Sequence, residues 1–354
     1  MKLKTLLLAS LFPLFIYSQT IVGTTKEKKN VILEEYTGIH CGYCPDGHRI
    51  AKELKDSHPN DVFIINIHTG SFASPYTGEP DFRTQFGSSF ASNAKVQGYP
   101  AGSINRKRPN NTSYPGHAIG RSSWKYFAQN TILTEDAYLN VGVKAKVNPN
   151  TRLLTVIMEV YYTDNSPTSS NQLNVALLQN NTKGPQSGGQ MGNQYVHNHR
   201  LIHMVTGQWG ETINNTSNSS FVSKTFTYTI PNDHRGIAID INELEVVAFA
   251  TQESRNNIIS GDGASVSVGS FNNNEFVTNY FNLFPNPSNS GEIQISTPHP
   301  NTSLKIYDIL GKLVFEKNNL DNLQTINLNT LNQGVYQAII QHKDLIEVEK
   351  IILN

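Results

Sequence analysis

The only two cysteines of the chain, Cys41 and Cys44, stand three residues apart between two segments of different pattern. Residues 31–37 (VILEEYT) predict a strand, whereas residues 44–57 carry apolar side chains at helical spacing and predict a helix. Unpaired backbone N–H groups and the helix dipole stabilise a thiolate at a helix start. We therefore predict a redox-active disulfide, with Cys41 as the exposed nucleophile and Cys44 as the buried resolving thiol.

The same cysteine pair has less reactive interpretations, which the sequence leaves open. The disulfide could be structural or vestigial, although a ring this small constrains little of the unfolded chain's entropy. A zinc site could combine Cys41 and Cys44 with His40 or His48, but structural zinc takes four ligands and the chain has no second cysteine pair. We accordingly predict no metal and no cofactor.

The first 18 residues predict export. Lys2 and Lys4 give a positive start, and residues 6–16 form an apolar segment that is too short to span a membrane. Small Ser18 stands at a suitable cleavage position, so residues 1–18 are predicted to be a signal peptide. No second apolar run reaches spanning length, so we expect no transmembrane segment after signal removal. The exported compartment is oxidising and permits a disulfide.

Composition limits the class of partner. Lys and Arg total 28 and so do Asp and Glu, which gives a formal net charge of zero. A nucleic-acid partner would require a basic surface, so we expect none. The hydrophobic fraction of 38% is ordinary for globular proteins, and 354 residues suggest two or three domains.

Three regions with different patterns follow the signal peptide. Residues 30–133 alternate strand and helix patterns and predict an α/β domain, in which Phe82, Phe86 and Phe90 mark a core-facing helix. Residues 134–272 hold spaced period-2 stretches between Asn, Ser and Gly clusters, which predict an all-β sandwich. Residues 280–354 predict a small all-β domain.

The second region contains two further candidates. Its Gly- and Gln-rich residues 184–192 predict an exposed, mobile loop. His197 and His199 would share one face of a strand, with His203 nearby, a pattern that suits a metal but is more typical of surface or hydrogen-bonded histidines. Tyr195 could line a binding surface, as could Trp209, although core or rim positions are more usual for such residues.

Residues 31–44 (VILEEYTGIHCGYC) resemble the first core strand and active-site loop of the thioredoxin superfamily. The resemblance implies that Glu35, six residues before the first cysteine, is a buried acid that assists proton transfer to and from the second. It also implies that residues 96–100 (VQGYP) carry the family's cis-proline. The Tyr99–Pro100 peptide would then lie beside the disulfide and pair with a substrate strand.

The signal peptide, the cysteine segment, residues 98–102 (GYPAG) and the following β region together resemble the outer-membrane-protein-twenty-eight family over roughly residues 30–270. Residues 280–354 are similar to the type A sorting domain of the type IX secretion system. The matching pieces are FPNP at 284–287, IYDILGK at 306–312, GVY at 334–336 and the terminal KIILN. This resemblance implies the type IX secretion machinery as a partner and a secreted or cell-surface, outer-membrane-associated location.

Two functions remain open from the sequence. The first is an exported thiol–disulfide oxidoreductase or isomerase acting on protein thiols and disulfides, with Cys41, Cys44, Glu35, Tyr99 and Pro100 as its site. The second is a surface binding or adhesion protein in which the β-sandwich binds and the cysteine domain is a scaffold, with Glu35 an ordinary strand-end acid. The sequence does not decide whether the protein is an enzyme.

Overall fold

The computed structural model describes residues 21–110, 113–252, 255–269, 281–297, 301–321, 323–342 and 345–354. The predicted signal peptide lies outside the described residues. The chain forms two compact units, one of them Thr20–Phe271 and the other including Asn272–Asn354. Within the described ranges, the helices are all too short or too polar to cross a membrane.

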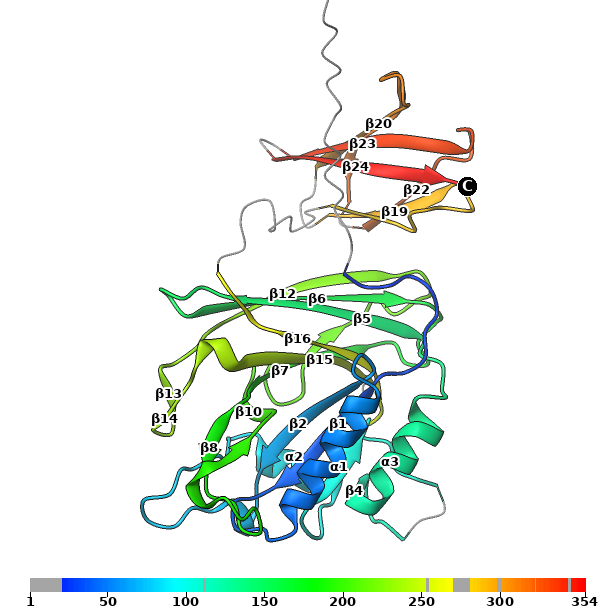
Figure 1. The fold of residues 1–354 in the computed structure, drawn as a ribbon. Helices are drawn as coiled ribbons and strands as arrows, with labels where there is room; N and C mark the ends of the chain where they lie inside the picture. Colours follow the sequence, from blue (N-terminus) through cyan, green and yellow to red (C-terminus); the bar gives the residue numbers. More distant parts are fainter. Residues whose placement is uncertain are drawn as a thin grey trace, which may run out of the picture. The chain divides into compact units, whose positions relative to one another are not determined.

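The first part of the larger unit alternates strands and helices, as predicted (Figure 1). Its elements are β1 (Val31–Thr37), α1 (Cys44–Ser57), β2 (Val62–His68), η1 (Ser71–Ala73), α2 (Gly87–Ala94), β3 (Ala101–Ile104), β4 (Ala118–Gly120), η2 (Arg121–Ser123), α3 (Trp124–Phe127) and the π-helical η3 (Ala128–Ile132).

The rest of the larger unit is rich in strands. Its elements are β5 (Leu139–Val147), β6 (Leu153–Tyr162), β7 (Asn171–Gln179), β8 (Thr182–Gly184), η4 (Gly192–Gln194), β9 (Tyr195–His197), β10 (Arg200–Met204), β11 (Glu211–Ile213), β12 (Phe221–Thr229), β13 (Asp233–His234), β14 (Ile237–Ala238), η5 (Ile241–Glu243), β15 (Leu244–Gln252), β16 (Ile258–Ser265) and β17 (Ser267–Val268).

Strands β2, β1, β3 and β4 lie in this order, with β1 parallel to β2 and antiparallel to β3. Helices α1 and α3 share a core with one face of these strands, and α2 packs on the other face. Parallel neighbours need a crossover connection, which α1 supplies. This is the thioredoxin-like α/β arrangement that the sequence predicted.

The sheet does not stop at β2. Strand β10 pairs with the free side of β2, and the sheet continues through β7 and β15 to β16. The β2–β10 pairing is short, but Asn66 on β2 strengthens it, because its backbone N–H and its side-chain amide donate to the carbonyls of His199 and Asn198. One nine-stranded sheet therefore crosses the predicted domain boundary at residues 133–134.

The β-rich part is a sandwich. A second sheet with the order β12-β6-β5-β17 faces β7, β15 and β16, and apolar side chains of both sheets form one core. Strand β6 shows why these residues form the sandwich. Leu154, Val156, Met158 and Val160 alternate along the strand and are fully buried.

The C-terminal unit is all β, as predicted. Its elements are β18 (Asn282–Phe284), β19 (Glu292–Ser296), β20 (Thr302–Tyr307), β21 (Leu313–Leu320), β22 (Leu323–Asn327), β23 (Gly334–His342) and β24 (Leu345–Leu353). They form a three-stranded sheet, β18-β19-β22, and a four-stranded sheet, β21-β20-β23-β24. Alternating residues such as Leu304, Ile306, Ala338 and Ile340 fill the core between the sheets.

Candidate functional site at the Cys41–Cys44 disulfide

Strand β1 places its two glutamates on opposite faces of the sheet. Side chains alternate along a strand, so Leu33 and Glu35 face α1 while Glu34 faces α2. All seven residues of the strand are buried. The alternation therefore puts one carboxyl on each side of the sheet, each in a different environment.

The two cysteines form a disulfide with their Cα atoms 5.3 Å apart. Helix α1 begins at Cys44, and Pro45 occupies its first turn, where a missing backbone N–H costs nothing. Cys44 is fully buried, as predicted, whereas Cys41 is only 3% exposed. Cys41 is therefore much less accessible than its predicted nucleophilic role would require, and the cause lies in another part of the chain.

A loop from the β-rich region covers the disulfide. Residues 185–194 connect β8 to β9, and Gln186 Nε2 donates to the carbonyls of Gly38 and Cys41 at 3.1 and 3.0 Å. The backbone N–H of Ser187 donates to the carbonyl of Ile39 at 2.8 Å. The predicted exposure of residues 184–192 is confirmed for most of this covering loop, but Gln186 is buried and hydrogen-bonded to the cysteine segment.

Glycine is required where the covering loop meets the cysteine motif. Gly188 has a φ of +77°, and a Cβ there would lie 2.2 Å from the carbonyl oxygen of Gly42. Any side chain would push the loop away from the disulfide. Glycine at position 188 therefore allows the loop to lie against the cysteine motif.

The Tyr99–Pro100 peptide bond is cis, as predicted. It directly precedes β3, which pairs with β1 in a register that places Gly102 opposite Glu35. A Cβ added to Gly47 in α1 would lie 3.0 Å from Pro100 Cβ and 2.7 Å from Glu35 Oε1. Pro100 and Glu35 thus both lie close to Gly47, which is three residues beyond Cys44.

Glu35 has no exposed surface, and neither of its carboxyl oxygens has a hydrogen-bond partner among the described residues. Burial raises the pKa of Glu35 well above its ordinary value of 4.5. A titratable group close to it is His48, whose Nε2 is 3.8 Å from Glu35 Oε1. Burial lowers the pKa of His48 to about 4, so this contact is not an ion pair at neutral pH.

His48 and Tyr195 are site residues that the sequence did not identify in this role. His48 Nε2 is 2.9 Å from Thr37 Oγ1, and His48 Nδ1 is 2.7 Å from the Tyr195 hydroxyl. Burial, with a smaller contribution from the charge of Glu35, raises the pKa of Tyr195 to about 12, so its hydroxyl stays protonated. The spacing of His48, four residues after Cys44, places both on one helix face and is the signal that could have found it.

The three histidines of the predicted cluster are not brought together. His197 is buried against Phe82, His199 lies 2.5 Å from Glu245, and His203 stacks on Tyr228. The first two share no strand, because β9 ends at His197 and His199 has a positive φ of 53°. In the parts of the chain that the structure describes, no group of three or more His, Cys, Asp and Glu side chains is placed to hold a metal ion.

The other glutamate of β1 has a different partner. Arg106 Nε is 3.0 Å from both carboxyl oxygens of Glu34, and Arg106 Nη2 is 2.5 Å from Glu34 Oε1. Both side chains are buried, and the guanidinium also lies over the rings of Phe90 and Trp209. Glu34 is a paired buried charge, whereas Glu35 on the other face is unpaired.

We expect Glu34→Gln and Glu35→Gln to change stability in opposite directions. Glu34→Gln leaves the buried Arg106 charge without its counter-ion, which costs about 3–5 kcal/mol. The pKa of Glu35 is raised on folding, so the wild type loses stability as the pH rises above 4.5 toward that raised pKa. Glu35→Gln cannot lose that proton, so its stability relative to the wild type should increase from pH 4.5 to pH 8. Urea unfolding at both pH values measures this.

The two adjacent variants control for each other, because each removes one carboxylate from the same buried strand. Equal destabilisation by both, with no dependence on pH, would contradict the assignment of Glu35 as an unpaired acid.

We expect Gln186→Ala to expose the disulfide. The substitution removes the two hydrogen bonds to Gly38 and Cys41, each worth about 1 kcal/mol, so reduction of the disulfide by dithiothreitol should accelerate about 3- to 30-fold. Quenched alkylation followed by mass measurement gives the rate. Gln190→Ala is the matched control, because it removes an exposed glutamine from the same loop. An unchanged rate in Gln186→Ala would show that the loop does not limit access.

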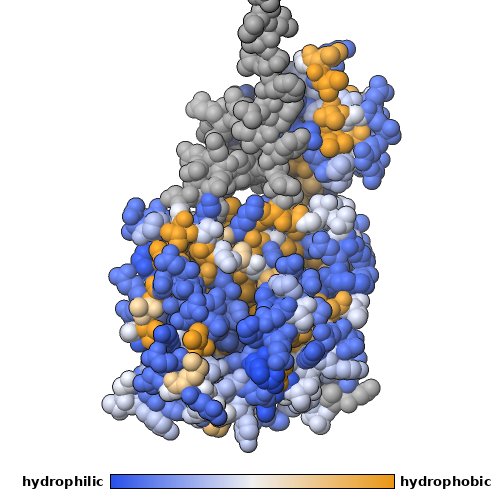
Figure 2. Space-filling view, viewed as in Figure 1, coloured by the Kyte–Doolittle hydropathy of each residue, from blue (hydrophilic) through white to orange (hydrophobic). Residues whose placement is uncertain are grey.

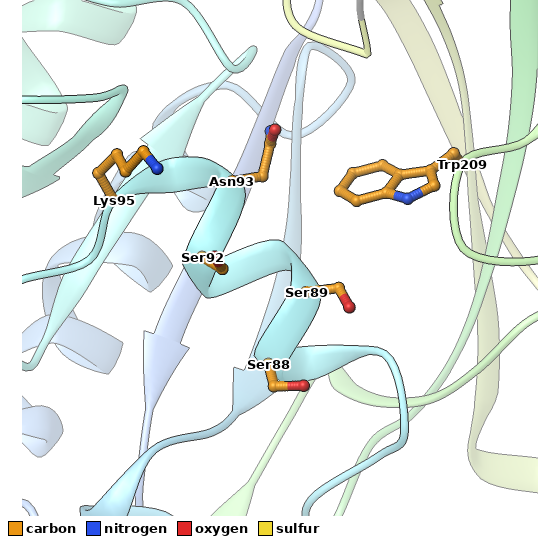
Figure 3. Close-up of a pocket in the computed structure, with 6 residues that line it drawn as sticks. All are labelled: Ser88, Ser89, Ser92, Asn93, Lys95 and Trp209. Carbon is orange, nitrogen blue, oxygen red and sulfur yellow. The ribbon is translucent and has the colours of Figure 1, made fainter.

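A second feature of the larger unit is an open hollow of about 530 Å³ between α2 and the segment after β10. Figure 3 shows the serine side chains along α2 and the Trp209 ring across from them. The hollow is lined by Ser88, Ser89, Ser92, Asn93, Lys95 and Trp209. It lies on the α2 side of the sheet, whereas the Glu35 carboxyl lies on the α1 side.

About half of the chain matches a known protein family. Residues 87–269, just over half of the 354 residues, match the family model for outer membrane protein Omp28. The chain belongs to the Omp28 family. The match begins after the disulfide, so it is shorter than the expected 30–270 and leaves Cys41 and Cys44 outside. Residues 282–354 match the secretion system C-terminal sorting domain. This Omp28-family protein is thus secreted through the type IX system and associated with the cell surface and outer membrane.

The chain shares its fold with a solved structure at low sequence identity. HBP35 of Porphyromonas gingivalis superposes with a TM-score of 0.55 and 21% identity, over 93% of this chain and 99% of that one. A domain of the outer membrane lipoprotein Omp28 from Porphyromonas gingivalis matches at 17% identity and a TM-score of 0.28, over 38% of this chain and 92% of that one. No curated protein sequence matches this Omp28-family chain.

Proposed function

We propose that this Omp28-family protein is an exported thiol–disulfide oxidoreductase whose substrates are the thiols and disulfides of other proteins. The observation that supports this most is the Cys41–Cys44 disulfide at the start of α1, with the unpaired carboxyl of Glu35 beside Gly47 of the same helix, three residues beyond Cys44. Buried polar groups without partners are rare, and perturbed acids cluster at functional sites. A structural disulfide has no need of such a carboxyl.

The chemistry is exchange through a mixed disulfide. The Cys41 thiolate attacks one sulfur of a substrate disulfide, forms a bond to it and releases the other substrate sulfur as a thiolate. Cys44 then gives its proton to the Glu35 carboxylate and attacks Cys41 Sγ. The bond between Cys41 and the substrate breaks, the second substrate sulfur leaves as a thiolate, and the Cys41–Cys44 disulfide remains. Oxidation of a substrate dithiol is the reverse sequence.

The neighbouring residues support this chemistry by position. The Tyr99–Pro100 peptide, next to the first turn of α1, offers its backbone groups to an extended substrate. His48 lies between Glu35 and Tyr195, where a neutral imidazole can pass a proton between the buried acid and the Tyr195 hydroxyl.

A second candidate function is binding at the cell surface without redox chemistry, favoured by the hollow beside Trp209. Insulin reduction by the whole protein, together with the reduction potential of Cys41–Cys44, separates the two functions. We expect catalysed reduction and a potential above about −300 mV, the range of labile rather than structural disulfides. A lower potential without catalysis would contradict the oxidoreductase function and favour surface binding.

A further inference from the structure

The two most exposed large apolar side chains in the described parts of the chain lie in the C-terminal unit. Ile309 is 80% exposed and Leu310 is 88% exposed, and no other large apolar side chain among the described residues exceeds 71%. The two residues are adjacent and stand in the connection from β20 to β21. We call this pair the hairpin tip. Single exposed apolar side chains are normal on protein surfaces, but neighbouring ones indicate an interaction site.

The turn that carries the hairpin tip is held by polar groups. Asp308 Oδ1 accepts hydrogen bonds from the backbone N–H groups of Leu310 and Lys312, both at 2.9 Å. The backbone N–H of Asp308 donates to the carbonyl of Lys312 at 2.9 Å, and that of Gly311 donates to the carbonyl of Asp308 at 3.0 Å. Gly311 has a φ of +80°, which glycine adopts without strain. The turn therefore uses Asp308 and Gly311 and does not require apolar side chains at positions 309 and 310.

Neighbouring connections of the C-terminal unit lack such a pair. The sequence between β21 and β22 is Asp-Asn, and that between β23 and β24 is Lys-Asp. The connection from β22 to β23 has two leucines, but Leu328 is fully buried and Leu331 packs against the core of the unit. Turns are dominated by Gly, Pro, Asn, Asp and Ser. The hairpin tip thus differs from ordinary turns and from these three connections of its own unit.

The hairpin tip offers apolar area that its own unit does not cover. The core of the unit is filled by other side chains, among them Leu304 and Ile306 of β20. Leu313 directly follows the turn and adds aliphatic surface, since it is 41% exposed. On the face drawn in Figure 2, hydrophobic side chains of the C-terminal unit lie at the surface beside hydrophilic ones. Because hydrogen bonds already fix the turn, a partner that covers the tip restricts little further motion of the backbone.

The role of the C-terminal unit indicates which partner fits the hairpin tip. The unit matches a secretion system C-terminal sorting domain, so the type IX machinery interacts with it. Aliphatic side chains on a rigid turn suit a small apolar pocket in a protein, where close packing excludes water. Membrane-binding segments instead combine a longer apolar face with several Lys or Arg residues. The tip has two adjacent aliphatic residues between Asp308 and Lys312, which favours a protein over a lipid surface.

We propose that the hairpin tip inserts into an apolar pocket on a protein component of the type IX secretion machinery, and that this contact is required for export. The inference does not rest on the proposed oxidoreductase function, because both cysteines of the chain lie outside the C-terminal unit. Failure of one proposal therefore leaves the other intact.

The double variant Ile309→Ser, Leu310→Ser of the whole protein tests this in cells that carry the type IX system. We expect most of the surface labelling to be lost and the protein to accumulate inside the outer membrane. The purified variant should keep the thermal transitions of the wild type, because both side chains are exposed and Asp308 still holds the turn. The conservative variant Ile309→Leu, Leu310→Ile should be displayed normally, because it keeps the tip apolar.

Leu323→Ser is the matched control. Leu323 is 44% exposed and lies on β22, in the other sheet of the C-terminal unit, so this variant should be displayed as the wild type is. Direct contact is measured with the photoreactive residue p-benzoylphenylalanine at position 310 of the whole protein, and at position 323 as the control. Illumination of exporting cells should give an adduct from position 310 with a type IX protein, identified by its peptide masses, and none from position 323.

Normal display of the double variant would overturn the inference, as would equal loss of display in Leu323→Ser. The inference would also be overturned if position 310 gave no adduct, or an adduct only with lipid or with a second copy of this chain. If the double variant does not fold, the adduct from position 310 decides the question alone.

Discussion

Cys41→Ser should reduce the insulin-reducing activity to the uncatalysed background, because a serine hydroxyl is not ionised near neutral pH and cannot replace a thiolate. Cys44→Ser should also stop turnover, but for a different reason. It keeps the attacking thiol and removes the thiol that resolves the mixed disulfide. Incubation with a disulfide substrate should therefore trap a covalent complex with Cys44→Ser, which mass measurement detects.

The two variants form a matched pair, because both lose the same disulfide and its small contribution to stability. A structural disulfide predicts the same phenotype for both. The oxidoreductase predicts trapping only in Cys44→Ser, since the thiol left in Cys41→Ser is fully buried. Trapping by Cys41→Ser alone would reverse the roles of the cysteines, and trapping by neither would leave the disulfide without a catalytic role.

Deletion of residues 280–354 should abolish surface display and leave the rest of the protein folded. The chain separates into two compact units near residue 272, and the C-terminal unit has a core of its own. The removed residues contain the whole match to the sorting domain. Surface labelling of intact cells should show loss of most of the signal.

The control for the deletion is the fold of the retained part. Purified truncated protein should keep its thermal transition and its thiol–disulfide activity. Normal display of the truncated protein would contradict the export role, whereas loss of the transition would show that the two units depend on each other for folding.

The core of the site could be predicted because local patterns determine it. The strand at 31–37 and the helix from Cys44 follow from an apolar run and from apolar side chains at helical spacing, whereas the burial of Glu35 was implied by the resemblance to the thioredoxin superfamily. Burial of Phe82, Phe86 and Phe90 was also confirmed, but α2 starts only at Gly87, so the first two reach the core from an irregular segment. Regularly spaced apolar residues show which side chains face inward, but they do not show whether the backbone at those positions is helical.

Contacts distant in sequence could not be predicted. Gln186 binds a carbonyl 145 residues earlier in the chain, and nothing in a glycine-rich segment shows which surface it meets. The hydroxyl of Tyr195 reaches His48 across 147 residues for the same reason. The pairing of β10 with β2 could not be predicted, because the sequence of a short apolar strand does not indicate which strand it pairs with.

The continuous sheet has a consequence for how this architecture can be inherited. Strand β2 has β10 as its outer neighbour, so a gene fragment encoding only residues 30–133 would produce a sheet with a long apolar strand at its margin. Exposed edge strands of this kind pair with other chains and promote aggregation. The cysteine-bearing half therefore cannot be exchanged between proteins as a free module, and genetic recombination that preserves a working protein must carry both halves together.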